Sequence, residues 1–135
     1  KLSGIFGRII IVTNQRGIGI ELMTDEDLYN IHEKMVAAIQ ETGGRIDAIY
    51  YAPAADRSDI RRKPNPTMAY EAQKDFPEID LAKSIIVGNS ISDMEFGRNA
   101  GMRTIFIDEK KKYGGEKTSI MDEISNSLYN WTDSL

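Results

Sequence analysis

Three short segments of this sequence, residues 13–15, 61–63 and 89–93, carry side chains that could bind a phosphate group or a metal ion. The first offers a hydroxyl and two amides, the second three cations, and the third an amide and a carboxylate four residues apart. Each segment also has an ordinary structural explanation. Their chemistry therefore depends on whether one fold places them at the same edge.

The first segment, Thr13-Asn14-Gln15, follows a run of β-branched residues and precedes Gly17 and Gly19. Backbone N–H groups, a hydroxyl and an amide donor at the end of a strand suit the oxygens of a phosphate. A polar turn whose side chains hydrogen-bond to the backbone explains the same residues. Taken alone, the segment leaves both interpretations open.

The second segment places Arg61, Arg62 and Lys63 directly before Pro64. Lysine is a compact point charge for a phosphate, and arginine offers a planar two-pronged donor. Runs of like charge more often lie on a solvated surface. Taken alone, this segment therefore favours an exposed basic loop.

In the third segment a strand-like stretch ends at Gly88, and Asn89 and Asp93 follow with a spacing of four. Oxygen ligands there would suit Mg²⁺, which takes a few protein oxygens and keeps waters or substrate phosphate around it. An amide stands where a carboxylate would be expected. The alternative is that Asn89 or Ser90 simply caps the helix that follows.

The elements that must position these segments alternate between strands and helices. Apolar and β-branched runs predict strands at 8–13, 46–51, 84–87 and 103–107, and amphipathic spacing predicts helices at 24–41, 66–74, 91–100 and through 120–131. That order is typical of an α/β fold with a mainly parallel sheet between helical layers. Ligands of such folds bind outside the carboxyl ends of the strands, where all three segments fall.

Composition narrows the class of protein. The chain has 135 residues, 41% hydrophobic and 28% charged, which suits one soluble domain. A net charge of −4 without a basic stripe argues against nucleic-acid binding, and the lack of cysteine excludes thiolate metal sites. No apolar run is long enough to cross a membrane, and the first residues do not resemble a signal peptide. We therefore expect a cytoplasmic protein with no nucleic-acid or membrane partner.

Read in order, "IIIVTNQRGIG", "RRKPNPTM" and "IIVGNSISDMEFGRNAGMRTIFI" resemble the second, third and fourth motifs of the haloacid dehalogenase (HAD) superfamily. The likeness is greatest to its histidinol-phosphatase and heptose-bisphosphate phosphatase branch, and it extends over residues 8–107. It implies a three-layer, Rossmann-like HAD core over residues 1–112. Residues 113–135 would form a C-terminal helical tail.

The resemblance also implies an activity. Proteins of this kind are Mg²⁺-dependent phosphomonoester hydrolases that work through an aspartyl-phosphate, here on a small phosphorylated metabolite such as a heptose-type sugar phosphate. By match, Thr13 and Asn14 would bind the phosphate, with Gln15 beside them. Lys63 would be the catalytic cation that pairs with the phosphate oxygens and the nucleophile, and Arg62 would contact the substrate.

The same match assigns the metal site to Asn89 and Asp93, and Asp93 would also orient Lys63. Because the amide of Asn89 carries no charge, we expect weakened but not abolished Mg²⁺ binding. The branch often has a zinc loop before its lysine motif, but its ligand positions are occupied here by Ala52, Ala54, Asp59 and Arg61. No zinc is expected.

The largest departure from the family concerns its first motif, an Asp-x-Asp pair at the end of the central strand. Only twelve residues precede Thr13, and none of them is acidic. We therefore expect the nucleophile, the acid/base aspartate and the first, central strand to lie outside these 135 residues. The chain by itself would be inactive, with residues 1–7 forming the end of a helix that leads into the first strand.

Two alternatives to a phosphatase remain. The chain could be a catalytically dead phosphatase-like module that binds or regulates, either fused to another domain or self-associated. A receiver-type phosphoacceptor domain is disfavoured, because such a domain needs acidic residues where this chain has Thr13, Asn14 and Gln15. The one histidine, His32, is expected to lie on a helix, at the surface or partly buried, far from the strand ends and without a catalytic role.

Overall fold

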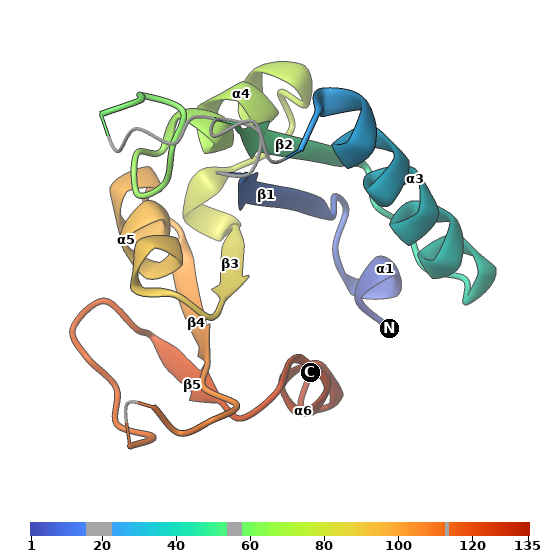
Figure 1. The fold of residues 1–135 in the computed structure, drawn as a ribbon. Helices are drawn as coiled ribbons and strands as arrows, with labels where there is room; N and C mark the ends of the chain where they lie inside the picture. Colours follow the sequence, from blue (N-terminus) through green and yellow to red (C-terminus); the bar gives the residue numbers. More distant parts are fainter. Residues whose placement is uncertain (16–22, 54–57, 113) are drawn as a thin grey trace. The chain divides into compact units, whose positions relative to one another are not determined.

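The computed structural model describes residues 1–15, 23–53, 58–112 and 114–135 (Figure 1). It divides into two compact units, unit 1 (residues 1–62) and unit 2 (residues 63–135). The paired strands of each unit are parallel, and helices connect β1 to β2 and β3 to β4, as expected of an α/β fold. Within the described residues, no helix is long and apolar enough to cross a membrane.

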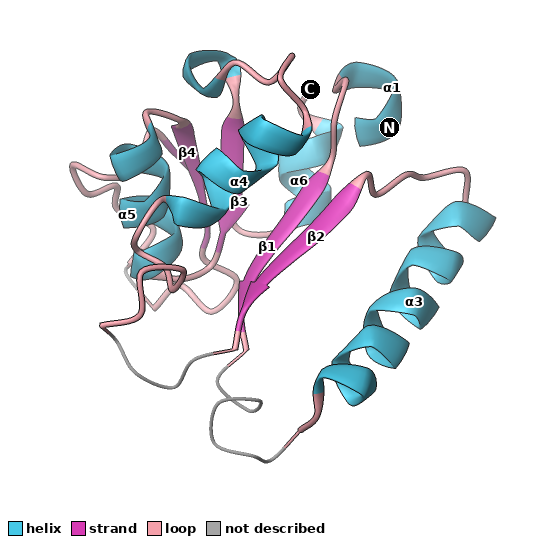
Figure 2. Cartoon of the chain, turned by 90° about the horizontal axis from the view of Figure 1, so that it is seen from above, coloured by secondary structure: helices cyan, strands magenta, loops and turns pink. Residues whose placement is uncertain are grey.

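Unit 1 is built on two parallel strands, β1 (Ile10–Asn14) and β2 (Ala48–Ala52), which lie side by side in Figure 2. Their register pairs Thr13 with Tyr51 and Asn14 with Ala52, so the polar end of β1 lies beside the end of β2. The short helix α1 (Leu2–Ile5) precedes β1, and α3 (Asp25–Glu41) connects the two strands.

Helix α3 begins where its sequence predicts. The hydroxyl of Thr24 accepts the backbone N–H of Asp27 at 3.0 Å, and the carboxylate of Asp27 accepts the N–H of Thr24 at 3.0 Å. This capping box satisfies N–H groups that a helix start leaves unpaired. The helix ends before Gly43, which has a φ of 81° that favours glycine.

The entry to β1 is held by Asp47, which lies just before β2. Its carboxylate accepts hydrogen bonds from the backbone N–H of Ile9 at 2.7 Å and from Nε–H of Arg45 at 3.0 Å. It also forms an ion pair with Arg8 at 3.3 Å. Arg45 also donates to the carbonyl of Phe6 at 2.8 Å. Burial by itself would raise the pKa of Asp47, but these hydrogen bonds outweigh it and lower that pKa. The cluster fixes the start of both strands.

Unit 2 contains a three-stranded parallel sheet in the order β3–β4–β5. Its elements are α4 (Thr67–Asp75), a 3-10 helix (Leu81–Lys83), β3 (Ile85–Gly88), α5 (Ile91–Ala100), β4 (Arg103–Ile107), β5 (Glu123–Ser125) and α6 (Leu128–Asp133). Buried Met94, Phe106 and Met121 form the centre of its core. The bounds of α5 and β4 are those that the sequence predicts.

Helix α5 lies close against β3 and β4 because position 97 is glycine. A Cβ added to Gly97 would lie 2.5 Å from Cγ2 of Ile86 and 2.6 Å from Cγ2 of Thr104. Such distances are far inside van der Waals contact, so any larger residue would push the helix off the sheet. This packing sets where the N-terminus of α5 meets the end of β3.

The expected helix through residues 120–131 is wrong. Residues 123–125 form β5, which pairs with β4 from Ile105↔Glu123 to Ile107↔Ser125, and only α6 is helical. The physical reason is the side chain of Asp122. It accepts the N–H of Thr104 at 2.9 Å and receives both guanidinium prongs of Arg98, at 2.8 and 3.0 Å. These bonds hold the segment extended along the edge of β4 that does not pair with β3.

Candidate active site

The candidate site in unit 2 is the turn between β3 and α5. Ser90 caps α5, because its hydroxyl accepts the backbone N–H of Asp93 at 3.2 Å. In return, Oδ2 of Asp93 accepts the backbone N–H groups of Ser90 and Asn89, both at 3.2 Å. The expected alternative of a capped turn is therefore present, with Ser90 as the capping residue. The capped turn still leaves the second carboxylate oxygen of Asp93 for another partner.

That partner is Lys63, whose ammonium donates to Oδ1 of Asp93. The side chain of Lys63 is 10% exposed and that of Asp93 is 11% exposed, so this ion pair is almost removed from water. A buried pair is stable only when its remaining hydrogen-bonding capacity is satisfied. Asp93 meets that condition, since Lys63 and two backbone N–H groups share its two oxygens. The arrangement places one lysine charge at the carboxyl end of β3.

Gly88 makes this arrangement possible. A Cβ at position 88 would lie 2.5 Å from Cβ and 2.6 Å from Cγ of Asp93. The missing side chain lets the carboxylate approach the backbone at the end of β3. A glycine directly before the Asn89 turn suggests that another group approaches the backbone there. The sequence alone does not show that this group is the carboxylate of Asp93.

The amide of Asn89 is placed differently from the carboxylate of Asp93. Asn89 is an exposed residue whose backbone N–H donates to Asp93, whereas Asp93 is buried. Within the described ranges, no group of three or more His, Cys, Asp or Glu side chains could hold a metal ion. Mg²⁺ normally requires one or two carboxylates in addition to waters or substrate phosphate. One neutral amide and one already satisfied carboxylate are an incomplete donor set, so the described residues alone do not fit a resident Mg²⁺.

In unit 1, Thr13 and Asn14 are the last residues of β1, Gln15 follows directly, and all three are half-buried. The side-chain amide of Gln15 donates to Oγ1 of Thr13 at 3.0 Å, and the backbone N–H of Gln15 donates to the carbonyl of Ala52 at 2.8 Å. The Thr13 hydroxyl is thereby held at the carboxyl end of the strand. Gly17 and Gly19, which follow in the sequence, lie outside the described residues.

The basic segment is less exposed than its charge predicts. Arg61, Arg62 and Lys63 are all half-buried, so an exposed basic loop is wrong for them. The backbone N–H of Arg61 donates to Oδ1 of Asp59 at 2.8 Å, and that of Arg62 to the carbonyl of Asp59 at 3.1 Å. Asp59, one of the aligned zinc-loop positions, therefore holds the turn that leads to Lys63. Ala54, another of those positions, lies outside the described residues.

His32 lies closer to a strand end than expected. Its ring centroid is 6.3 Å from that of Tyr51, at an interplanar angle of 66°, and Tyr51 stands opposite Thr13 in the β1–β2 register. The hydroxyl of Tyr51 donates to Asp25 at 2.8 Å. That hydrogen bond, with burial, raises the pKa of Tyr51. Nothing in the spacing of these three residues along the sequence indicates that they meet.

Comparisons with known proteins identify the family of this chain. Residues 60–128 match the HAD-hydrolase-like family model. A D-glycero-alpha-D-manno-heptose-1,7-bisphosphate 7-phosphatase of Burkholderia mallei is 35% identical over 106 residues, covering 73% of this chain and 56% of the relative. A D-glycero-beta-D-manno-heptose-1,7-bisphosphate 7-phosphatase of Yersinia pestis is 30% identical over 129 residues, covering 89% of this chain and 68% of the relative.

A solved structure is also similar. The D,D-heptose 1,7-bisphosphate phosphatase of B. bronchiseptica, complexed with magnesium and phosphate, superposes with a TM-score of 0.82 at 26% identity, over 94% of this chain and 73% of that one. The chain spans little more than half the length of several curated relatives, 56% of those from B. mallei and Chlorobaculum tepidum. With its parallel sheets and Rossmann-like α/β fold, this chain belongs to the HAD-hydrolase-like family, in the branch that contains the heptose-bisphosphate phosphatases.

Proposed function

We propose that this chain is the phosphate-binding part of a phosphomonoester hydrolase that acts on a heptose-type sugar phosphate. The observation that carries the proposal is the buried contact between Lys63 and Asp93 at the carboxyl end of β3. The names of the relatives, which are phosphatases of heptose bisphosphates, support the same substrate class. The partner of the protein is then a small phosphorylated metabolite, not a nucleic acid or a membrane.

In the proposed reaction, a carboxylate outside residues 1–135 attacks the phosphorus, a P–O bond forms and the ester P–O bond breaks. A second acid there protonates the leaving sugar oxygen, and water then hydrolyses the acyl phosphate to give inorganic phosphate and the free carboxylate. Phosphoryl transfer depends mainly on positioning and charge stabilisation. This chain supplies those functions through Lys63, whose ammonium offsets charge on the transferring oxygens. Asp93 positions Lys63.

The remaining residues of the first two segments have binding roles in this proposal. Thr13 and Asn14 donate hydrogen bonds to phosphate oxygens, and Gln15 orients the Thr13 hydroxyl through their 3.0 Å contact. Arg62 contacts the sugar phosphate outside the reacting group. Hydroxyl, amide and guanidinium donors of this kind recognise phosphate by direct hydrogen bonding.

We propose further that Mg²⁺ is bound weakly and that zinc is absent. When bound, Mg²⁺ would offset negative charge on the phosphate. The side chains of Asn89 and Asp93 supply one charged and one neutral donor, so further carboxylates from the segment that holds the nucleophile would complete the site. We place the protein in the cytoplasm.

The test uses the full-length protein that contains this chain. It is assayed with Mg²⁺ for phosphate release from heptose 1,7-bisphosphate and a panel of sugar monophosphates. We expect activity on the heptose substrate, and a Lys63→Met variant should lose about 10²- to 10³-fold in kcat because a preorganised positive charge is removed. The catalytic proposal is wrong if a full-length protein that has the Asp-x-Asp motif releases no phosphate from any of these substrates.

One observation favours a second function. The neutral Asn89 at a position where a metal ligand is expected agrees with a phosphatase-like module that binds phosphorylated metabolites without hydrolysing them. Titration calorimetry with heptose 1,7-bisphosphate separates the two. Binding without turnover supports the module, whereas binding with turnover supports the enzyme.

A further inference from the structure

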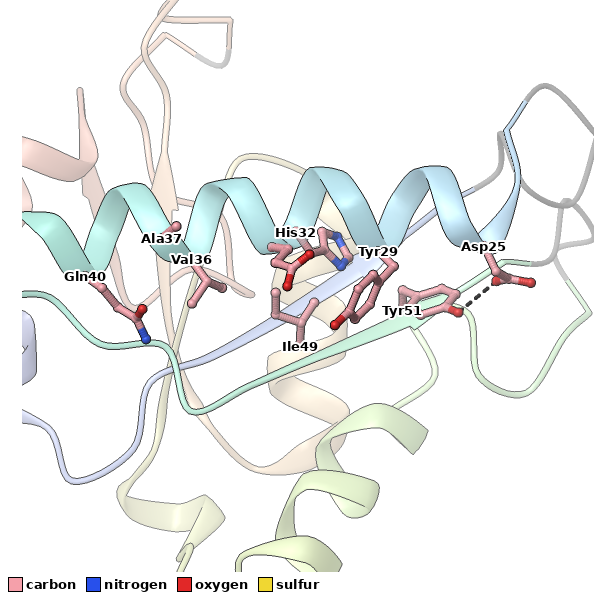
Figure 3. Close-up of a pocket in the computed structure, with 9 residues that line it drawn as sticks. Asp25, Tyr29, His32, Val36, Ala37, Gln40, Ile49 and Tyr51 are labelled. Atoms are coloured by element: carbon pink, nitrogen blue, oxygen red, sulfur yellow. Dashed lines mark hydrogen bonds between the residues drawn. The ribbon is translucent and has the colours of Figure 1, made fainter.

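A groove between α3 and β2 in unit 1 has no role in the proposed phosphatase. It has a volume of about 570 Å³, within the range of small-molecule sites, and Figure 3 shows side chains from both elements pointing into it. Its polar and aromatic lining residues are Asp25, Tyr29, His32, Glu33, Gln40 and Tyr51. We propose that this groove binds a small organic cation with an apolar or aromatic body, such as an arylalkyl ammonium.

The charges of the groove favour a cation. Asp25 and Glu33 are carboxylates, and among the described lining residues none is a lysine or an arginine. Arg61 is the opposing charge, since it lies near enough to Tyr51 to act against the rise in the pKa of that tyrosine. Asp25 already accepts the Tyr51 hydroxyl at 2.8 Å. The ammonium group therefore belongs at Glu33, away from the Arg61 end.

Aromatic rings supply the second element of recognition. A cation over the face of a tyrosine is attracted by the ring quadrupole. Tyr51 is held in place by its bond to Asp25 and by the edge contact with His32 at 6.3 Å. Tyr29 is 64% exposed and lines the same groove from α3, so its ring has a free surface for a ligand. Two tyrosines from different elements thus flank one volume.

The floor of the groove is apolar. Val36 and Ala37 of α3 and Ile49 of β2 line it, and Figure 3 places them between the aromatic end and Gln40. Within α3, all of whose residues are described, only Leu28 is buried. The described residues of this chain therefore leave much of this 17-residue helix uncovered. A ligand with a hydrocarbon body would remove that apolar surface from water, which is favourable in proportion to the area covered.

The experiment titrates the full-length protein with benzyltrimethylammonium chloride, followed by calorimetry and by amide NMR shifts. Benzyl alcohol and phenylacetate serve as neutral and anionic ligands with the same ring. We expect saturable millimolar binding of the cation, with shifts on α3 and β2. Benzyl alcohol should bind about two- to fivefold more weakly, as a lost cation–π contact at an exposed site predicts. Equal binding of all three ligands, or no saturable binding of the cation, would refute the proposal.

Variants locate the site. Glu33→Gln should weaken cation binding about two- to fivefold and reduce its dependence on salt. Glu26→Gln removes a matched exposed carboxylate from the same helix, outside the groove lining, and should change nothing. Tyr29→Ala should weaken binding and Tyr29→Phe should preserve it, since the ring rather than the hydroxyl is used. Equal effects of Glu33→Gln and Glu26→Gln would show that only the overall charge matters and would overturn the assignment.

None of these variants touches the residues to which we give a role in phosphate transfer. Phosphatase activity should therefore be unchanged by Glu33→Gln and Tyr29→Ala, and unfolding monitored by circular dichroism should confirm that both remain folded. The cation-binding proposal can therefore be refuted while the phosphatase proposal is supported, and the reverse is also possible.

Discussion

The backbone of Gly88 lies directly against the carboxylate side chain of Asp93, with space for a hydrogen but not for a methyl group at position 88. This contact joins the end of β3 to the first turn of α5. Because the same carboxylate binds Lys63, the glycine also determines where the lysine charge is held. The close approach is thus a structural requirement of the candidate site, and it can be tested by single substitutions.

Gly88→Ala should destabilise the protein by about 1–3 kcal/mol, because the new methyl group overpacks the turn. The displaced Asp93 would also release Lys63, so phosphate affinity should fall together with stability. Urea unfolding and phosphate binding measure the two effects. Gly7→Ala is the control, since a Cβ there has nothing within 4 Å. Unchanged stability of Gly88→Ala would show that the turn can relax.

The Lys63–Asp93 pair should show strong coupling in a double-mutant cycle. Asp93→Asn removes the carboxylate that faces a nearly buried lysine charge, which should cost about 3 kcal/mol. The double variant Lys63→Met/Asp93→Asn should lose less than the sum of the single variants, since both charges of the pair are then removed together. Arg103 and Glu123 provide an exposed comparison, with side chains 58% and 37% exposed. Their coupling should stay below about 1 kcal/mol. Additive effects at Lys63 and Asp93 would contradict the role given to the pair.

Asn89→Asp should strengthen Mg²⁺ binding by the full-length protein roughly tenfold, because a charged oxygen replaces a neutral one. Calorimetric titration with MgCl₂ measures this affinity directly, without an activity assay. Asn30→Asp makes the same change at an exposed position of α3 and should leave the affinity unchanged. If both variants behave alike, Asn89 is not at a metal position.

Stability should fall in acid through Asp122. The hydrogen bonds from Arg98, followed by that from the Thr104 N–H, lower the pKa of Asp122 from 3.8 to about 2. A carboxyl group with a lowered native pKa stabilises the fold above pH 3.8, and this contribution is lost as the pH falls from 3.8 toward about 2. With about a third of the side chain exposed, the contribution is on the order of 1 kcal/mol.

Asp122→Asn should therefore be less stable than the parent protein at pH 6 and nearly equal to it at pH 2. Urea unfolding at both pH values measures the difference. Asp27 and Asp47, whose pKa values are also lowered, leave some acid sensitivity in the variant. A constant difference between variant and parent at both pH values would exclude Asp122 as a source of the pH dependence.

Much of the fold could be predicted because its elements have strong local signals. The capping box at Thr24 and Asp27, the run of β-branched residues in β1 and the limits of α5 depend on residues within one turn or one strand. The order of strands and helices then implied parallel pairing and polar strand ends. The family resemblance rests on the same segments, and the comparisons confirm it. These features follow from local periodicity and turn chemistry, which a single sequence carries.

The tertiary structure alone decided the remaining features, because each depends on residues distant in sequence. The helical spacing in residues 120–131 was overridden by Asp122, which binds Arg98 and Thr104, and by the pairing of residues 123–125 with β4. Lys63 and Asp93 are 30 positions apart, and their contact requires the space left at Gly88. The meeting of Asp25 with Tyr51 likewise has no local signal. Hydrogen bonds and packing between distant residues depend on three-dimensional placement, so composition and spacing could name the chemical groups but not their partners.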